Sequence, residues 1–151
     1  MLGVCRRYAR NMDDAKDILQ DSFIKIFNHL NDFRNEGSLE GWMRKIMVHT
    51  ALNHYRNSSF KSEKSGLDKQ QNAAEIDPDA MDNLNEQDIM NAISALPDGY
   101  RMVFNLYAVE GYSHKEIAEI LGIDESTSRS QLFKARNILK AVLLKTKNIF
   151  V

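Results

Sequence analysis

Residues 113–136 read SHKEIAEILGIDESTSRSQLFKAR, and they carry the clearest structural signal in the chain. Ser113 can accept a hydrogen bond from the backbone N–H of Glu116 while the Glu116 side chain bonds back to Ser113, which is the capping box that begins many helices. Gly122 can end this helix, and Asp124 can cap the next one. A connection this short holds two helices at a steep angle. The stretch therefore predicts a helix-turn-helix.

The second helix of this motif has an apolar inner face and a polar outer face. Leu132, Ala135, Leu139 and Val142 follow the helical spacing of a core stripe. Arg can donate two hydrogen bonds to guanine, Gln can pair with adenine, and Lys neutralises phosphate, so the outer face suits a major groove. Its candidate DNA contacts are Thr127, Arg129, Ser130, Gln131, Phe133, Lys134 and Arg136. The alternative is an antiparallel pair of helices that binds no DNA.

Helices should also dominate the rest of the chain. Only Pro78 and Pro97 are prolines, and runs of alternating β-branched residues are hard to find. Pro97 can occupy the first turn of a helix that runs to about Glu110, which Gly111 can end in the left-handed conformation. The sequence therefore predicts an all-α fold.

The composition limits the possible functions. The formal net charge is −1, so a case for DNA binding depends on where the charges lie. Cys5 is the single cysteine, which excludes an internal disulfide and a multi-cysteine metal site and indicates a reducing compartment. No apolar run approaches the roughly 18 residues of a membrane span. We expect a cytoplasmic protein without membrane insertion, and, with no nucleophile, metal cluster or phosphate loop, no enzymatic activity and no cofactor.

Charge divides the chain into three parts. Residues 42–64 are basic, residues 68–98 are acidic, and the residues from 126 to the end contain cations and no acid. The acidic part has few large apolar groups and cannot offset the entropy of ordering it. We expect two small helical domains, residues 1–58 and 85–151, joined by a flexible acidic linker at residues 59–84.

The first domain begins with a strongly periodic helix for which Asp13 is a plausible N-cap. Its apolar stripe predicts a core face made by Ala15, Ile18, Leu19, Phe23, Ile26, Phe27 and Leu30. The opposite face carries Asp17, Gln20, Asp21 and the apolar Ile24. This face is either a plain solvated surface with one stray Ile or a strip that binds a partner, and periodicity alone favours the former.

A second helix follows a break at residues 31–37, with Ser38 as its N-cap. Its apolar stripe contains Leu39, Trp42, Met43, Ile46 and Met47. The other face carries cations and amides that suit phosphates and base edges, including Lys45, His49, Asn53 and Arg56. An ordinary polar surface would look the same, so this face alone does not indicate DNA binding.

Together these segments resemble one known family over nearly the whole chain. LP at residues 96–97, RMVF at 101–104, EGYSHKEIAEILG at 110–122 and SQLFKAR at 130–136 resemble region four of extracytoplasmic-function (ECF) sigma factors. DAKDILQDSF at residues 14–23 resembles the region-two helix that docks on the clamp helices of RNA polymerase. Phe33, Arg34, Gly37, Ser38, Trp42, Met43 and Ile46 resemble the part of region two that reads promoters.

The resemblance implies a transcription initiation factor with three contact surfaces. Asp17, Gln20, Asp21 and Ile24 would meet core RNA polymerase. The loop with Phe33, Arg34, Asn35 and Ser38 would hold a flipped base of the minus-ten element, flanked by Lys45, His49, Asn53 and Arg56; capture of such a base can offset the cost of unstacking it. The outer face of the second helix of the helix-turn-helix would contact the minus-thirty-five duplex. Family membership also implies an anti-sigma factor.

The chain differs from the family pattern in several places. His49 stands where an Asn is usual, Ser128 where an apolar residue is usual, and Gln131 where a basic residue is common. About twenty residues that form the first region-two helix usually precede the position of Met1, so we expect that helix to be truncated. The alternatives are a regulator that binds DNA through the same helix-turn-helix without polymerase and, more distantly, a helical scaffold or adaptor.

Overall fold

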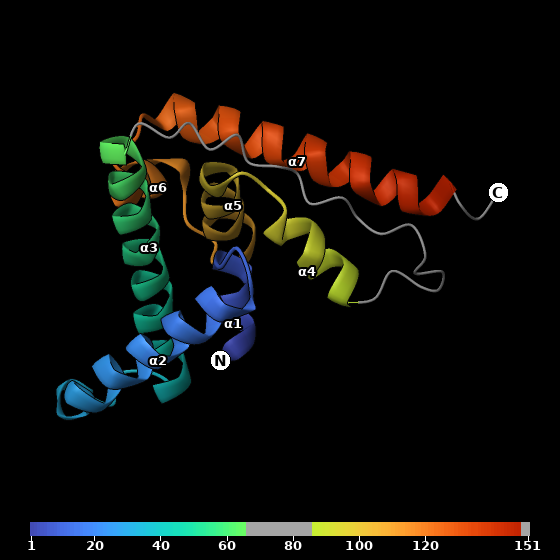
Figure 1. Cartoon of the computed structure of the whole chain (residues 1–151). Helices are drawn as coiled ribbons and strands as arrows, with labels where there is room; N and C mark the ends of the chain where they lie inside the picture. Colours follow the sequence, from blue (N-terminus) through green and yellow to red (C-terminus); the bar gives the residue numbers. More distant parts are fainter. Residues whose placement is uncertain (66–85, 149–151) are drawn as a thin grey trace. The chain divides into compact units, whose positions relative to one another are not determined.

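The computed structural model describes residues 1–65 and 86–148. Within these residues every regular element is a helix (Figure 1). The chain divides into two compact units, with the boundary between Gln70 and Gln71. The predicted all-α class with two small helical domains is confirmed, whereas residues 66–84 of the flexible linker expected at residues 59–84 lie outside the described residues.

The N-terminal unit consists of α1 (Leu2–Tyr8), α2 (Met12–Asn28), a 3₁₀ turn η1 (Leu30–Asp32) and α3 (Leu39–Ser65). Each of the three α-helices packs against the other two. Their facing sides form an apolar core of Val4, Cys5, Tyr8, Ala9, Ala15, Ile18, Ile26, Met47, Val48, Ala51 and Leu52. Helix α3 continues past residue 58, the predicted end of the first domain.

The start of α2 differs from the prediction. The helix begins at Met12 and its N-cap is Asn11, whose side chain accepts a hydrogen bond from the backbone of Asp14 at 2.8 Å. Asp13 lies inside the first turn, where its negative charge complements the helix dipole. Both residues are typical caps, so the sequence alone could not choose between them.

The predicted core face of α2 is wrong at its C-terminal end. Phe23, Phe27 and Leu30 are exposed, with Phe27 80% accessible. Helices α1 and α3 cover a narrower sector of α2 than the apolar stripe spans, and the centre of that sector is occupied by Ser22. The buried Ser22 hydroxyl donates to the carbonyl of Ile18 at 2.6 Å, which satisfies it without another side chain.

The C-terminal unit consists of α4 (Glu86–Ser94), α5 (Asp98–Phe104), a π-helical turn η2 (Asn105–Val109), α6 (His114–Leu121) and α7 (Glu125–Asn148). Helix α7 packs against α4, α5 and α6. The core contains Met90, Ala92, Ile93, Leu96, Met102, Val103, Leu106, Ile117, Leu132 and Ala135. As predicted, Gly111 and Gly122 have positive φ, at 79° and 68°.

The helix expected from Pro97 to Glu110 is divided. Pro97 is the N-cap of α5 rather than part of its first turn. After Phe104 the hydrogen bonding widens to the π pattern, in which the backbone of Glu110 donates to the carbonyl of Asn105 at 3.0 Å. A π turn inserts one residue into a helix and shifts the direction of the side chains that follow. Tyr107 lies in this turn.

A buried ion pair within α5 also connects this helix to the end of α4. Arg101 donates to the carboxylate of Asp98 at 2.6 Å, and to the carbonyls of Leu96 at 2.8 Å and Ser94 at 3.2 Å. The Arg101 side chain is only 3% exposed. Its guanidinium therefore satisfies carbonyls at the end of α4 that have no partner within that helix.

Candidate nucleic-acid interface

The helix-turn-helix is present with the geometry that its sequence predicts. Ser113 and Glu116 form the capping box of α6: Glu116 N donates to Ser113 Oγ at 3.2 Å and Ser113 N donates to Glu116 Oε2 at 2.7 Å. These hydrogen bonds lower the pKa of Glu116 and keep its carboxylate charged. Gly122 ends α6 in the left-handed conformation, and α7 begins directly after Asp124.

Ser128, the polar residue at a usually apolar position of α7, is fully buried. Its hydroxyl is hydrogen-bonded to Nδ1 of His114, at the start of α6, over 2.9 Å. The polar side chain therefore has a partner across the two helices of the motif, so it connects them. Burial lowers the pKa of His114 from its ordinary 6.5, and the nearby positive charge of Arg129 adds to this effect, so the imidazole is neutral at pH 7.

The candidate DNA contacts on α7 divide by exposure. Thr127 and Gln131 are half-buried, whereas the exposed residues are Arg129, Ser130, Phe133, Lys134 and Arg136. Phe133 is 66% accessible, so its ring contributes little to the packing of the core. Arg129 forms an exposed ion pair with Glu125 one turn earlier on the same helix. Such a pair is weakly held and can yield the Arg to a phosphate or a base.

Gln131 contacts another helix of the unit. A Cβ atom on Gly99 of α5 would lie 3.3 Å from Nε2 of Gln131. The Gln131 amide therefore lies beside a glycine that leaves room for it, where α5 and α7 pack together. Its role as a DNA contact stays a prediction.

An aromatic group that the sequence did not single out lies beside the candidate contacts. The rings of Tyr107 and His114 stack with centroids 4.6 Å apart and an interplanar angle of 19°. The guanidinium carbon of Arg136 lies over the Tyr107 ring, 5.5 Å from its centroid. Tyr107 reads as a core residue in the helical pattern, and the π turn that aims it could not be predicted from that pattern.

In the N-terminal unit, the loop before α3 contains two residues with positive φ. Asn35 adopts a φ of 56°, unusual for a residue other than glycine, and Gly37 a φ of 106°. The ring of Phe33 packs on that of Trp42 at 5.5 Å, so both are half-buried. Ser38 accepts from the backbone of Gly41 at 3.0 Å, which agrees with its predicted role as a cap. Arg34 and Asn35 are exposed.

The candidate minus-ten residues of α3 share one exposed face. Lys45, His49, Asn53 and Arg56 recur at a spacing of three or four residues and all are exposed. The residues between them, Met47, Val48, Ala51 and Leu52, are in the core. The opposed faces predicted for this helix are therefore present, and the polar one lies on the same helix as the loop at residues 33–38.

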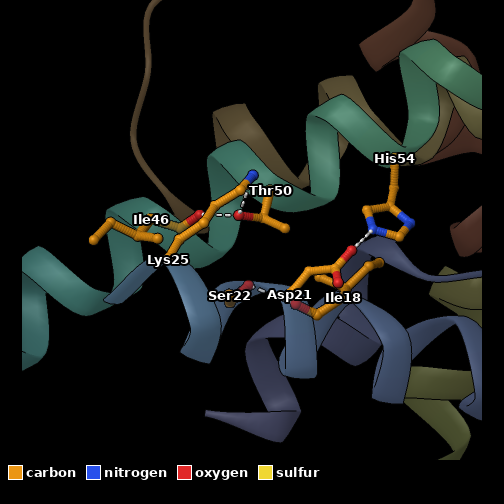
Figure 2. Close-up of polar contacts among 7 residues, drawn as sticks. All are labelled: Ile18, Asp21, Ser22, Lys25, Ile46, Thr50 and His54. Atoms are coloured by element: carbon orange, nitrogen blue, oxygen red, sulfur yellow. Dashed lines mark hydrogen bonds and ion pairs between the residues drawn. The ribbon is translucent and has the colours of Figure 1, made fainter. Parts of the chain in front are cut away.

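Polar contacts join the candidate polymerase-binding helix α2 to α3, as Figure 2 shows. The carboxylate of Asp21 is hydrogen-bonded to Nε2 of His54 at 2.8 Å, and Lys25 donates to the hydroxyl of Thr50 at 3.3 Å. Asp21 therefore has an internal partner. The other candidates, Asp17, Gln20 and Ile24, are exposed, and Ile24 is 53% accessible.

The exposed apolar residues extend beyond Ile24. Phe23 and Phe27 are also accessible on α2, together with Leu30 in η1. The sequence predicts that these residues are in the core because they continue the apolar stripe of α2. Their exposure depends on how much of α2 is covered by α1 and α3, which the stripe does not indicate. Contiguous exposed apolar side chains are typical of surfaces that bind another macromolecule.

The described residues contain no cluster of His, Cys, Asp and Glu side chains that could hold a metal ion. Among the helices of residues 1–65 and 86–148, none is long and apolar enough to cross a membrane.

Two family models match the chain in the order that the two units predict. Residues 1–60 match sigma-70 region 2, and residues 86–139 match sigma-70 region 4. The first match contains the α2 face, the residue 33–38 loop and the polar face of α3. The second contains the helix-turn-helix and all of its candidate DNA contacts.

Curated proteins and a solved structure agree with these matches. RNA polymerase sigma factor SigV of Bacillus subtilis is 29% identical over 91% of this chain and 81% of its own length. The ECF RNA polymerase sigma-E factor of Haemophilus influenzae is 28% identical over 91% of this chain and 78% of its own length. The sigma factor RpoE from Bartonella quintana, solved with the anti-sigma factor NepR, shares the fold with a TM-score of 0.57 at 24% identity, covering 94% of this chain and 88% of that one.

The region-2 match distinguishes this chain from a regulator with a helix-turn-helix alone, because the two regions together are those of RNA polymerase sigma factors. Members of this family bind RNA polymerase, direct transcription initiation and are not enzymes. With region 2 followed by region 4, and with ECF sigma factors among its relatives, this chain belongs to the sigma-70 family as an ECF sigma factor.

Proposed function

We propose that this sigma factor contacts promoter DNA through two surfaces, the outer face of α7 and the polar face of α3 with its preceding loop. The observation that carries the proposal is the exposure of Arg129, Ser130, Phe133, Lys134 and Arg136 together on the second helix of a capped helix-turn-helix. A helix in this position enters the major groove.

At the minus-thirty-five element, the exposed residues of α7 have different tasks. Arg129 reads a base edge after leaving Glu125, and Lys134 neutralises phosphate. Phe133 presses on a sugar or a thymine methyl. Thr127 and Gln131, whose side chains are half-buried, are the remaining candidate contacts of this helix.

At the minus-ten element, the loop at residues 33–38 holds an extruded base. Phe33 offers an aromatic ring that Trp42 supports, and Arg34, Asn35 and Ser38 provide polar groups around it. Lys45, His49, Asn53 and Arg56 follow the strand along α3. Stacking a base on an aromatic side chain contributes about 1–3 kcal/mol, which offsets much of the cost of unstacking it.

Core RNA polymerase docks on the exposed face of α2. Ile24 provides an accessible apolar contact, and Asp17 and Gln20 provide polar contacts around it. Asp21 contributes less directly, because its carboxylate already binds His54 and so fixes α2 against α3. An anti-sigma factor that binds this chain would compete for such exposed surfaces. The site of action is the cytoplasm, where the polymerase acts.

Selection from a duplex library of random sequence tests the DNA contacts. The full chain is assembled with core polymerase, and the bound duplexes are sequenced. Arg129→Ala should relax the preference at one base position, whereas Lys134→Ala should weaken binding to every sequence and lower the salt slope by about 1. If both variants select the same sequences with the same affinity as the wild type, the assignment of α7 is wrong.

Titration of core polymerase tests the α2 surface separately. Ile24→Gln should weaken the assembly, because it removes an apolar contact that is buried on docking. Met12→Gln is the matched control, since Met12 is an apolar residue of α2 with a similar exposure, 41%, in the first turn. Equal effects of the two substitutions would refute a docking site centred on Ile24.

A further inference from the structure

We propose that Tyr107 is a positioning residue for DNA recognition: its ring, stacked on His114, holds the guanidinium of Arg136 in place for the duplex. The inference rests on the proposed function, in which Arg136 contacts the minus-thirty-five element. It assigns a role to a residue of the π turn η2, outside the helix-turn-helix itself.

The contact geometry carries the first step. The guanidinium carbon of Arg136 lies 5.5 Å from the centroid of the Tyr107 ring, within the distance at which a cation is attracted to an aromatic face. Arg136 is otherwise an exposed side chain, and such a chain loses much rotamer freedom when it binds DNA. A ring that restricts the side chain in the free protein reduces that loss on binding.

The ring is itself held in place. Tyr107 stacks on His114 with centroids 4.6 Å apart, and His114 is bonded to the fully buried Ser128 of α7 at 2.9 Å. The path from Ser128 through His114 and Tyr107 to Arg136 therefore begins and ends on the same helix. Through these contacts, the position of the Arg136 side chain depends on how α6 packs against α7.

Burial and the charges around His114 keep its imidazole neutral at pH 7. Burial and the positive charges of Arg129 and Arg136 lower the pKa of His114, so its imidazole is uncharged and does not repel the guanidinium nearby. Glu125 acts in the opposite direction by raising the same pKa, yet the lowering effects prevail. The group that Arg136 meets in the free protein is thus a neutral pair of stacked rings.

A double-mutant cycle on the full chain tests the proposal, with a labelled duplex of mixed sequence as the probe. Tyr107→Leu should weaken duplex binding about two- to fivefold, the range that the strength of an exposed cation–π contact allows. Tyr107→Phe should bind like the wild type because it keeps the aromatic face. In an Arg136→Met background, Tyr107→Leu should have no further effect. In a Lys134→Met background it should keep its full effect, because Lys134 is an exposed cation of α7 with no contact to Tyr107 in the structure.

A second measurement does not depend on DNA. The NMR shift of the Arg136 Nε–H in the free chain should move toward its solvent-exposed value in Tyr107→Leu and remain unchanged in Tyr107→Phe, because the ring current of the aromatic face disappears only in the former. This shift reports the contact itself, and the double-mutant cycle reports its role: a loss of packing in Tyr107→Leu would weaken binding equally with and without the Arg136 guanidinium.

The outcomes separate the two hypotheses. If Arg136→Met weakens binding and Tyr107→Leu does not, the positioning role is overturned and the proposed function stands. If neither Arg136→Met nor Lys134→Met weakens binding, the DNA face of α7 is wrong, and the positioning role for DNA recognition falls with it even where the NMR shift shows the contact. Equal effects of Tyr107→Leu in both backgrounds would also overturn the inference.

Discussion

Replacing Arg101 with Met should strongly destabilise the C-terminal unit while leaving the N-terminal unit intact. Arg101 is buried, and its guanidinium binds the Asp98 carboxylate at 2.6 Å together with the carbonyls of Leu96 and Ser94. Met fills a similar volume but leaves the carboxylate without its cation. Breaking a buried pair by removing one partner costs about 3–5 kcal/mol.

That cost is large for a unit of this size. Residues 86–148 of the C-terminal unit are described, and at about 0.05–0.15 kcal/mol per residue a domain of that length has a stability of roughly 3–9 kcal/mol. For such a small domain, each kcal/mol lowers the melting temperature by about 4–8 °C, so the midpoint should fall by at least about 12 °C.

The position of the only tryptophan makes the two units separable in one experiment. Trp42 lies in α3, so selectively excited Trp fluorescence follows the N-terminal unit, whereas far-UV circular dichroism follows all helices. In Arg101→Met the dichroism midpoint of the C-terminal unit should fall while the fluorescence transition of the N-terminal unit stays in place. Asp98→Asn in the same background should recover part of the stability, because no charge is then left unpaired. An unchanged dichroism midpoint in Arg101→Met would refute the reasoning.

Further predictions concern the caps and His114. Gly122→Ala should destabilise the C-terminal unit by about 1–2 kcal/mol, because φ is 68° although nothing lies within 4 Å of the added Cβ; Gly3→Ala, in ordinary helical backbone, serves as its control in urea unfolding. Asn11→Ala should cost the N-terminal unit about 0.5–2 kcal/mol by Trp fluorescence, since it removes the cap of α2. The folded-state pKa of His114 is below its ordinary 6.5, so the unfolded chain takes up the proton first as the pH falls. The contribution of His114 to the stability of the C-terminal unit should therefore be constant above about pH 6.5 and decline below it. His114→Gln should flatten that decline. An identical pH profile in the variant would exclude His114 as its source.

The sequence predicted best where local chemistry alone determines the structure. The capping box at Ser113 and the left-handed Gly122 depend on residues within a few positions of each other, and both are present as expected. The separation of α3 into polar and apolar faces also follows from helical spacing.

Features that depend on distant partners were missed. Phe23 and Phe27 continue an apolar stripe, so only the extent of α1 and α3 determines that they are exposed. Ser128 interrupts the apolar face expected of the recognition helix, and its hydrogen bond to His114, on another helix, could not be predicted from the sequence. The π turn that aims Tyr107 toward Arg136 has no periodic signature, because it shifts the register on which periodicity depends.

Transcription of sheared genomic DNA from the source organism by core RNA polymerase, with and without this chain, tests the account of two promoter contacts most directly. Mapping the 5′ ends should show start sites that depend on the chain and share two sequence blocks upstream. Arg129→Ala should relax the block farther from the start, and His49→Ala the nearer one. A polymerase that gains no start sites from the chain, or blocks that neither substitution alters, would contradict the account.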